Sequence, residues 1–309
     1  MVGGVTVNKV KTTTSNKKKR IKSTGSDKVF DFFKNLILIT FTISCLYPLI
    51  YVFSCSISNG AAVDAGKVLF LPIKINFQSF SKVLSDKQFW ISYGNTFYYT
   101  IFGSLFSMLV SSPAAYVLSK KRFRAKRTIN MLLAFTMWFS PGFIPLYLNY
   151  SQLGTINNRV MMLVSFGIQA FNIILLRNYF ESVPSEMEES AGVDGANDFV
   201  IFTKIYLPLS KAALATVWLY YAMDRWNAYF WSSILLRDSS KIPLQVYLKQ
   251  KIIDQAIVSD YSSVIAGQQY SYNTIIYAMV TCAIIPVLII YPFIQRYFVK
   301  GVMVGGVKG

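Results

Sequence analysis

The chain has 309 residues, of which 53% are hydrophobic and only 15% are charged, and its mean hydropathy is +0.41. A soluble domain normally carries about a quarter charged residues, so the composition predicts an integral membrane protein. Histidine is absent, which excludes Ser/His/Asp and Cys/His catalysis, histidine metal sites and histidine proton relays. Cys45, Cys55 and Cys282 lie in or beside apolar runs and should pack as small hydrophobes. We therefore expect no catalytic residues and no metal site.

A basic head precedes the first apolar run. Residues 1–28 are rich in Ser, Thr and Lys and include Lys17-Lys18-Lys19-Arg20, which contributes to a net charge of +17. Beside a membrane span, such a run favours the cytoplasmic side and contacts anionic lipid headgroups. It is not interleaved with aromatic residues, as a surface for single-stranded nucleic acid would be, so we expect a lipid partner and no nucleic acid. Residues 1–28 should form a disordered cytoplasmic extension.

Charge-free runs locate the membrane spans within residues 29–295. Five runs lack Lys, Arg, Asp and Glu, at 35–63, 88–119, 128–158, 160–176 and 261–295. A sixth run, 212–233, is apolar and aromatic but contains Asp224-Arg225. A membrane helix needs roughly 20 residues, so each run can hold one helix. The sequence therefore predicts an all-α polytopic protein with six transmembrane helices near 36–57, 94–118, 129–150, 160–178, 212–233 and 273–295.

The distribution of Lys and Arg sets the orientation. If the N-terminus is cytoplasmic, the inside segments hold 21 of these residues and the outside segments hold nine. Positive residues accumulate on the cytoplasmic side of membrane proteins, so both termini are expected in the cytoplasm of a multi-pass cell-membrane protein. The segment between the fourth and fifth spans, residues 181–210, is then cytoplasmic too.

The segment 181–210 is polar and acidic. Pro184 suits a first helical turn, and Glu186, Glu188 and Glu189 place negative charge near the positive end of that helix dipole. These features predict a first short helix.

A bend and a second short helix should follow. Gly195 can adopt the left-handed conformation that ends a helix, and Asp198 can cap the next one. That second helix should carry Phe199, Phe202 and Ile205 on one apolar face and stop at Leu207-Pro208.

The fifth span contains the candidates for a solute path. At helical spacing, hydrogen-bonding groups and flat aromatic rings share one stripe, formed by Tyr220, Asp224, Asn227 and Trp231. Ionisable residues inside a span usually face the bundle interior or a wet cavity. Asp224 and Arg225 could instead neutralise each other at a packing interface. Asn149, Gln169 and Asn172 are weaker candidates, because single amides in membrane helices often bond only to a neighbouring helix.

Residues 296–309 form a Gly-rich cytoplasmic tail. Its Gly and Lys residues suggest a phosphate-binding loop, but no Ser or Thr follows Lys308. The chain is therefore expected to carry no ATPase site and to hold no cofactor.

The 181–210 segment resembles a known motif. Glu189, Ala191, Asp194-Gly195-Ala196, then Ile205 and Leu207-Pro208, are spaced as in the EAA loop of permease subunits of type I ABC importers. Ser190 and Lys211 depart mildly from that pattern. We refer to residues 181–210 as the EAA-like loop. The resemblance implies the type I importer permease fold, also called MetI-like.

Other stretches extend the resemblance from about residue 29 to the chain end. They resemble carbohydrate-uptake permeases, within these the maltose-permease-like second subunit, and most closely the polysaccharide or lipoprotein permease subgroup. The stretches are Pro113 to Ser119, Ser140 to Tyr147, Arg177 to Phe180, Trp226-Asn227, Arg296 to Gly301 and Val307 to Gly309.

The resemblance implies a set of partners for uptake of a sugar, such as an oligosaccharide. These are a homologous second permease, two cytoplasmic ATPase subunits that bind ATP and Mg, and an extracytoplasmic solute-binding protein or lipoprotein. It also implies that Glu189 meets a basic residue of the ATPase and that Asp194 and Gly195 shape the bend. The residues expected to couple to the ATPase are Glu188, Glu189, Ala191, Asp194, Gly195, Ala196, Phe202, Ile205, Leu207 and Pro208.

Other functions remain alternatives. Glu189 could be only a solvated acid at a helix start, and Gly195 only a helix stop. A secondary transporter should show internal repeats with broken helices in matched positions, and the sequence shows no repeat. A permease for a non-sugar solute is a further possibility. An ion channel would need a filter or charged ring, and only Asp224 could contribute to one.

Overall fold

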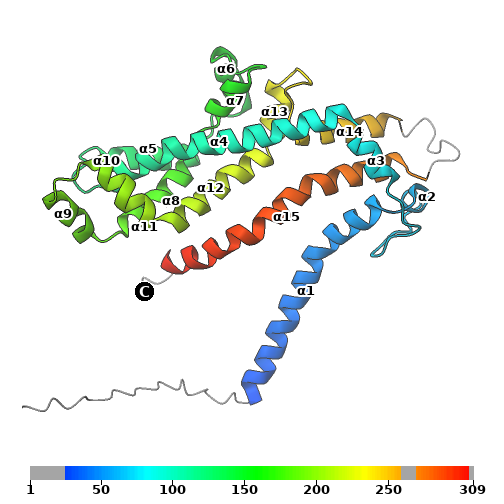
Figure 1. Ribbon diagram of the computed structural model, residues 1–309, viewed down its shortest axis with the longest axis horizontal. Coiled ribbons are helices and arrows are strands. Elements are labelled where there is room, and N and C mark those ends of the chain that lie inside the picture. The colour runs from blue at the N-terminus through cyan, green and yellow to red at the C-terminus, as the bar shows by residue number, and fades with distance from the viewer. Residues whose placement is uncertain (1–24, 259–268, 306–309) are drawn as a thin grey trace, which may run out of the picture. The chain divides into compact units, whose positions relative to one another are not determined.

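The structure is a computed structural model that describes residues 25–258 and 269–305. Every regular element in these ranges is helical (Figure 1). Residues 1–24 of the predicted extension and 306–309 of the predicted tail lie outside the described residues, whereas residues 25–28 already belong to the first helix. The helices before the EAA-like loop are α1 (Gly25–Ser56), α2 (Gly60–Asp64), α3 (Gln78–Leu84), α4 (Lys87–Ser119), α5 (Lys126–Trp138), α6 (Phe143–Gln152), α7 (Arg159–Ser165) and α8 (Ala170–Glu181). The later elements are α9 (Ser185–Val193), α10 (Asp198–Ile201), the π-helical η1 (Phe202–Tyr206), α11 (Leu207–Leu209), α12 (Lys211–Trp226), α13 (Phe230–Leu235), α14 (Leu244–Val258) and α15 (Tyr272–Gly305).

The chain forms two compact units, residues 1–49 and 50–309. The described part of the first unit is the beginning of α1, where large apolar side chains such as Phe30 and Phe41 are exposed around the helix. A helix that is apolar on all sides suits a lipid or a protein neighbour better than water. The second unit contains all the other helices.

Three helices are long and apolar enough to cross a membrane, namely α1, α4 and α15. Three bent pairs also qualify if each pair is one span: α5 with α6, α7 with α8, and the 198–209 helix with α12. The bends are 118°, 54° and 84°. The described residues therefore hold three to six candidate spans. Five of the six predicted segments fall on one of these elements, although 129–150 and 160–178 are bent pairs and not single helices. The sixth, 212–233, covers most of α12 but extends beyond its end at Trp226 into α13.

Local chemistry explains the bends. Pro141 disfavours helix at the residue before it, and Gly142 follows with φ +87°, so α5 ends before α6 begins. Between α7 and α8, a Cβ on Gly167 would lie 2.6 Å from the Phe106 ring, so a glycine allows the break to press against α4. Broken helices thus occur in this chain, and their presence does not separate it from secondary transporters.

Helix α4 lies at the centre of the second unit and packs against α8 and α12 (Figure 1). The middle of its buried face is made of small residues, among them Gly103, Ser104, Ser107 and Ser111. Small side chains let membrane helices approach closely, and the Ser111 hydroxyl also bonds to the Tyr221 hydroxyl at 2.7 Å.

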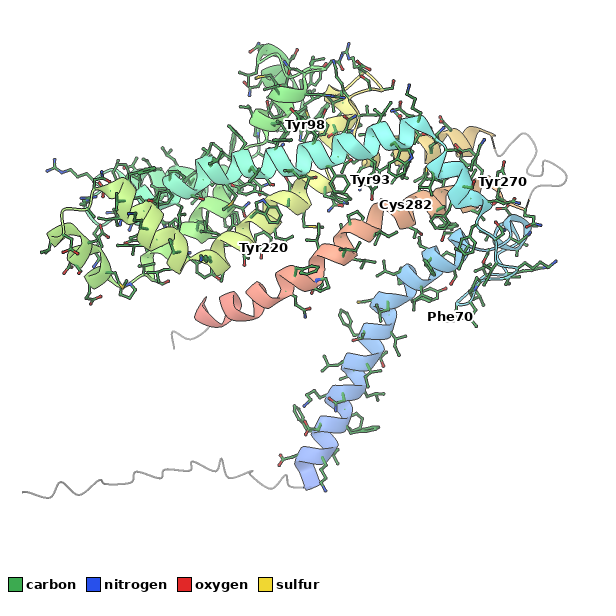
Figure 2. The ribbon with its side chains drawn as sticks, in the orientation of Figure 1. Phe70, Tyr93, Tyr98, Tyr220, Tyr270 and Cys282 are labelled. Carbon is green, nitrogen blue, oxygen red and sulfur yellow. The ribbon has the colours of Figure 1, made fainter. Side chains whose placement is uncertain are left out.

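Two hydrophobic clusters lie at opposite ends of α4. One surrounds Phe89 and Tyr99 and contains residues of α7, α13, α14 and α15. In the same region, Figure 2 shows Tyr93 of α4 near Cys282 of α15, and the Tyr93 hydroxyl donates to the Cys282 carbonyl at 3.0 Å. The other cluster surrounds Ala115 and Leu118 and contains residues of α8, α10, η1 and α12. Each cluster supports one candidate site.

The fifth predicted span ends earlier than expected. Helix α12 stops at Trp226, and residues 227–229 separate it from α13. The Asn227 amide donates to the Met223 carbonyl at 2.9 Å, which is the local side-chain bond by which Asn competes with helix continuation. The last helix is longer than predicted, because α15 continues into the tail, through Gly301 to Gly305.

Candidate functional site

The EAA-like loop folds as two helices with a bend, as the sequence predicts. Helix α9 ends at Val193, and Gly195 has φ +80°. The N–H of Ala196 donates to the Ala191 carbonyl at 2.9 Å, which closes the left-handed helix end. A Cβ at Gly195 would meet open space, so the backbone conformation alone favours glycine there.

The second helix of the loop differs from the prediction in its cap. Asn197, and not Asp198, is the cap residue, and its side chain accepts from the Val200 N–H at 2.9 Å. Asp198 is the first helical residue, where its charge still favours the helix dipole.

The apolar side chains of this helix have two environments. Phe199 is 72% exposed, whereas Ile201 and Tyr206, which the predicted face did not include, are buried. Five of the predicted coupling residues, Ala191, Ala196, Phe202, Ile205 and Leu207, pack against the cluster around Ala115. They therefore hold the loop onto the helices.

The helix also does not stop at Leu207-Pro208 but continues to Leu209, with a π-helical turn at residues 202–206. The Leu207 N–H donates to Phe202, five residues back. Pro208 has no N–H to donate to the Lys204 carbonyl, so a wider turn before it accommodates the missing bond.

The exposed face of the loop is acidic and apolar. Glu189 and Asp194 are exposed, as are Met187, Val193 and Phe199. Val193 is 90% exposed, the value of a side chain that touches almost nothing in its own chain. Among the described residues, the Glu189 carboxylate makes no ion pair. This face is free for a partner protein.

Glu188 faces the other way. Its Oε2 accepts from Lys120 Nζ at 2.6 Å and from the Tyr206 hydroxyl at 2.8 Å. The ammonium of Lys120 also lies 4.1 Å from the ring centroid of Tyr116 and 3.8 Å from that of Tyr206. Glu188 was predicted to couple to the ATPase, but the structure commits its carboxylate to groups of the same chain.

Burial and charge act against each other on this pair. Burial lowers the pKa of Lys120, and the hydrogen bond and charge of Glu188 offset part of that change. Burial by itself would raise the pKa of Glu188, but the bonds from Lys120 and Tyr206 outweigh it, so the pKa of Glu188 lies below its ordinary value. At 2.6 Å, the Lys120 ammonium and the Glu188 carboxylate form an ion pair.

Two further ion pairs link the segment after α4 to the loop. Arg122 contacts the Asp198 carboxylate, and Lys126 Nζ lies 2.6 Å from Glu181 Oε1. From the sequence alone, the positive charges of this segment indicated only the topology. Their pairing with acidic residues of the loop could not be predicted, because the partners are 55 to 76 residues apart in sequence.

A second candidate site is a cavity of about 400 Å³ at the other end of α4. Three of the four predicted path residues, Asp224, Asn227 and Trp231, line it, together with Gln169 and Tyr229. Tyr220 does not line this cavity (Figure 2 marks its place on α12), and its ring lies 6.3 Å from that of Phe171. The four residues do not share one helix face, because α12 ends at Trp226 and the chain changes direction before Trp231.

Two polar side chains of the cavity, Gln169 and Asp224, are bonded to each other and to the buried Asn172 behind them. Asn172 donates to Gln169 at 3.0 Å, and Gln169 Nε2 donates to Asp224 Oδ2 at 3.0 Å. The weaker candidates Gln169 and Asn172 thus join Asp224, whereas Asn149 is exposed on α6. An amide pair ending in a carboxylate offers acceptors to the hydroxyl groups of a solute.

Aromatic rings cover one side of the cavity. The Trp231 ring lies 5.6 Å from Phe143, 5.1 Å from Tyr150 and 6.2 Å from Phe166. Of these three rings only Phe166 lines the cavity, whereas Phe143 and Tyr150 support the Trp231 ring from behind. None of the three was predicted from the sequence, because they come from other segments of the chain. Flat apolar faces beside hydrogen-bonding groups suit a ligand with both kinds of surface.

Arg225 does not pair with Asp224. It is buried, and its guanidinium donates to the carbonyls of Met162 and Leu163, at 2.9 Å each. These carbonyls belong to the last turn of α7, where a cation is favoured by the helix dipole. The nearby backbone of Gly103 leaves room for it, because a Cβ there would lie 3.0 Å from Arg225 Nε. Arg225 fixes the broken helix that forms one wall of the cavity.

The described residues contain no group of three or more side chains that could hold a metal ion.

Comparison with known proteins identifies the relatives. Residues 26–304 match the family described as "Binding-protein-dependent transport system inner membrane component". The polygalacturonan/rhamnogalacturonan transport system permease protein YtcP of Bacillus subtilis (strain 168) is 37% identical over 284 residues, which cover 92% of this chain and 99% of YtcP. Protein LplC of the same organism is 31% identical over 287 residues, covering 93% of this chain and 97% of LplC.

A solved structure agrees with these relatives. One chain of a bacterial ABC transporter involved in the import of the acidic polysaccharide alginate is 47% identical. It superposes with a TM-score of 0.83 and covers 90% of this chain and 100% of that chain. The resemblance to ABC importer permeases of the MetI-like fold is thereby confirmed. This chain belongs to the family of binding-protein-dependent transport system inner membrane components.

Proposed function

We propose that this chain is one of two permease subunits of an ATP-driven importer that moves an oligosaccharide across the bacterial cell membrane. The observation that carries the proposal is the family match over residues 26–304, combined with the EAA-like loop whose acidic face is exposed. A homologous permease would complete the membrane part. An extracytoplasmic binding protein or lipoprotein would deliver the solute, in keeping with the family's description.

The proposed substrate is an oligosaccharide that carries carboxylates. YtcP is named for polygalacturonan and rhamnogalacturonan, and the similar solved transporter imports alginate, an acidic polysaccharide. Galacturonan units carry a carboxylate as well. The net charge of +17 on this chain is compatible with an anionic solute, although much of it lies in the basic head.

Two cytoplasmic ATPase subunits would bind ATP and Mg and drive the cycle. The exposed face of the EAA-like loop is the proposed contact, with Glu189 meeting a basic residue of the ATPase and Val193 and Phe199 entering an apolar cleft. Exposed apolar side chains beside acids suit a protein interface with an apolar centre and a charged rim. Asp194 and Gly195 set the angle at which the face is presented.

The proposed topology has six spans with both termini in the cytoplasm. It combines the three long helices and three bent pairs with the excess of Lys and Arg on one side. Accessible cysteines test it in a background without the three native ones. Lys67→Cys and Ser239→Cys should react with an impermeant reagent from outside, and Ser185→Cys only from inside, since all three positions are exposed. Outside labelling at position 185 would overturn the topology and the ATPase contact together.

The cavity lined by Gln169, Asp224 and Trp231 is proposed to lie on the solute path. Its amide and carboxylate groups can bond to sugar hydroxyls, and Trp231 can stack on a sugar ring. A bare carboxylate would repel a uronate, so Asp224 would meet a hydroxyl-bearing edge of the sugar.

The function is tested in proteoliposomes that contain this chain, the second permease, the ATPase and the binding protein. Uptake of a labelled oligogalacturonate should require ATP and the binding protein. A neutral malto-oligosaccharide of equal length is the control. Equal uptake of both would refute the acidic substrate class, and uptake that proceeds without ATP would refute the importer. The isolated chain should neither bind nor hydrolyse ATP, which nucleotide photolabelling of the purified chain measures.

A further inference from the structure

Two adjacent glutamates of α9 have opposite environments. Successive helical residues point about 100° apart, so Glu188 and Glu189 cannot share a face. Glu189 is exposed, whereas Glu188 accepts two hydrogen bonds from its own chain. The two residues carry the same charge in the same turn, and only their contacts distinguish them.

The environment of Lys120 is unusual for a lysine next to a membrane surface. Its side chain is only 8% exposed, and that of Glu188 is 27% exposed. The ammonium sits between the rings of Tyr116 and Tyr206 and bonds to the Glu188 carboxylate. Burying a charge is unfavourable unless it is paired, and here the carboxylate and two aromatic faces offset the loss of water. An exposed pair would be nearly dispensable, but a buried one is not.

The contacts connect three elements that are far apart in sequence. Lys120 directly follows α4, Glu188 lies on α9, and Tyr206 lies on η1. The aromatic rings strengthen the same junction, because Tyr116 lies 4.9 Å from Tyr206 and 5.0 Å from Phe202 between ring centroids. Both helices of the EAA-like loop are thus fastened to one end of α4.

Helix α4 reaches the cavity at its other end. Asn95 donates to the Ile242 carbonyl at 3.0 Å, Thr96 accepts from the Leu244 N–H at 2.7 Å, and Tyr99 lines the cavity. Helix α4 runs without a break from these residues to Ser119, which is about 30 Å at ~1.5 Å per residue. One helix therefore connects the loop to the cavity wall.

We propose that Lys120, Glu188 and Tyr206 form an internal clamp that makes the EAA-like loop and α4 move as one body. In this proposal Glu188 is a positioning residue and touches neither the ATPase nor the solute. The clamp rests on the proposed function only in that the loop receives its movement from an ATPase. Movement of the loop is then transmitted along α4 to the wall of the cavity.

The first test of the clamp measures the distance between a spin label on α4 and one on the EAA-like loop. Leu109 of α4 is 74% exposed and Val193 of the loop is 90% exposed, so Leu109→Cys and Val193→Cys can carry spin labels in the full chain in lipid nanodiscs, without the native cysteines. The distance distribution should be narrow in the otherwise unchanged chain and broad in Glu188→Gln. The matched control, Glu189→Gln, should leave it narrow. Equal distributions in both variants would overturn the clamp.

A second test measures transport per ATP hydrolysed in the complete reconstituted complex. We expect Glu188→Gln and Lys120→Met each to lower this ratio about fivefold or more, while ATPase subunits still co-purify and hydrolyse ATP. The double variant Lys120→Met/Glu188→Gln should be less impaired than Glu188→Gln alone, because it leaves no buried charge unpaired. Tyr206→Phe keeps the ring and should lower the ratio least. Additive losses in the double variant would contradict an ion-pair clamp.

The two tests separate this proposal from the proposed function. If ATPase subunits do not associate with the unaltered chain, the proposed function fails, and the spin-label distances still decide whether the clamp exists. A different outcome is that ATPase subunits associate with the unaltered chain but not with Glu188→Gln, which is the loss expected of Glu189→Lys. Glu188 would then be an ATPase contact, and the clamp would be wrong.

Discussion

The EAA-like loop and the cavity lie at opposite ends of α4 and are built in different ways. The loop takes its shape from residues close together in sequence, such as Gly195 with φ +80° and the cap residue Asn197. The cavity collects residues from α4, α7, α12 and α13 and from the break between α7 and α8. A single substitution that changes the backbone conformation can therefore change the shape of the loop, whereas the shape of the cavity depends on packing between helices.

The largest effect is expected from the backbone of the loop. Gly195→Val places a β-branched residue at a positive φ, which costs of order 1–3 kcal/mol and opens the bend. Uptake and stimulated ATP hydrolysis should be abolished in the reconstituted complex, while the chain still inserts into the membrane. Gly192→Ala is the matched control, since Gly192 is helical and a Cβ there meets open space. Normal uptake by Gly195→Val would show that the bend is not required.

A smaller but still large effect should come from the exposed acid. Glu189→Lys should weaken the association with the ATPase about tenfold or more, because it places like charges opposite each other at the proposed interface. Glu186→Lys changes the same charge in the first turn of the same helix and should have a weaker effect. Binding of the purified ATPase to nanodiscs that contain both permeases measures the difference. Equal weakening by the two substitutions would point to general charge attraction instead of a specific contact.

The cavity should respond through substrate affinity. Trp231→Leu removes a ring that contacts four other aromatic side chains. We expect the KM for uptake to rise about fivefold or more, as for the loss of about 1 kcal/mol of binding. Tyr220→Leu alters the same predicted stripe outside the cavity and should leave KM unchanged. Initial uptake rates over a range of oligogalacturonate concentrations give both values. A raised KM in both variants would mean that the cavity does not define the path.

The smallest effect concerns acid pH at the junction of the loop with α4. Since the pKa of Glu188 is lowered in the folded chain, its stabilising contribution is present above the ordinary glutamate pKa. That contribution is lost as the pH falls through the lower, folded value. In detergent, the melting temperature of the wild type should therefore exceed that of Glu188→Gln at pH 7. The two melting temperatures should become equal at acid pH. A constant difference across the range would contradict the assignment.

Much of the loop was predictable because its signals are local. The acidic first turn, the glycine bend and the apolar second helix follow from residues within about ten positions of one another. The errors were local too. Asn197 competes with Asp198 for the cap, and both residue types are good caps, so sequence could not choose between them. The predicted apolar face did not include Ile201 and Tyr206, which the junction with α4 buries, whereas Phe199 is exposed.

The sequence by itself determined the all-helical membrane character, the position of the EAA-like loop between the fourth and fifth apolar segments, and the family. These properties follow from hydropathy, charge and residue spacing along one chain segment. Only the tertiary structure decided which glutamate is bound within the chain, where the Arg225 guanidinium donates, and which path residues gather at one cavity. The physical reason is that ion pairs and cavity walls join residues from distant segments, and the helix breaks that bring them together change the direction of every side chain that follows.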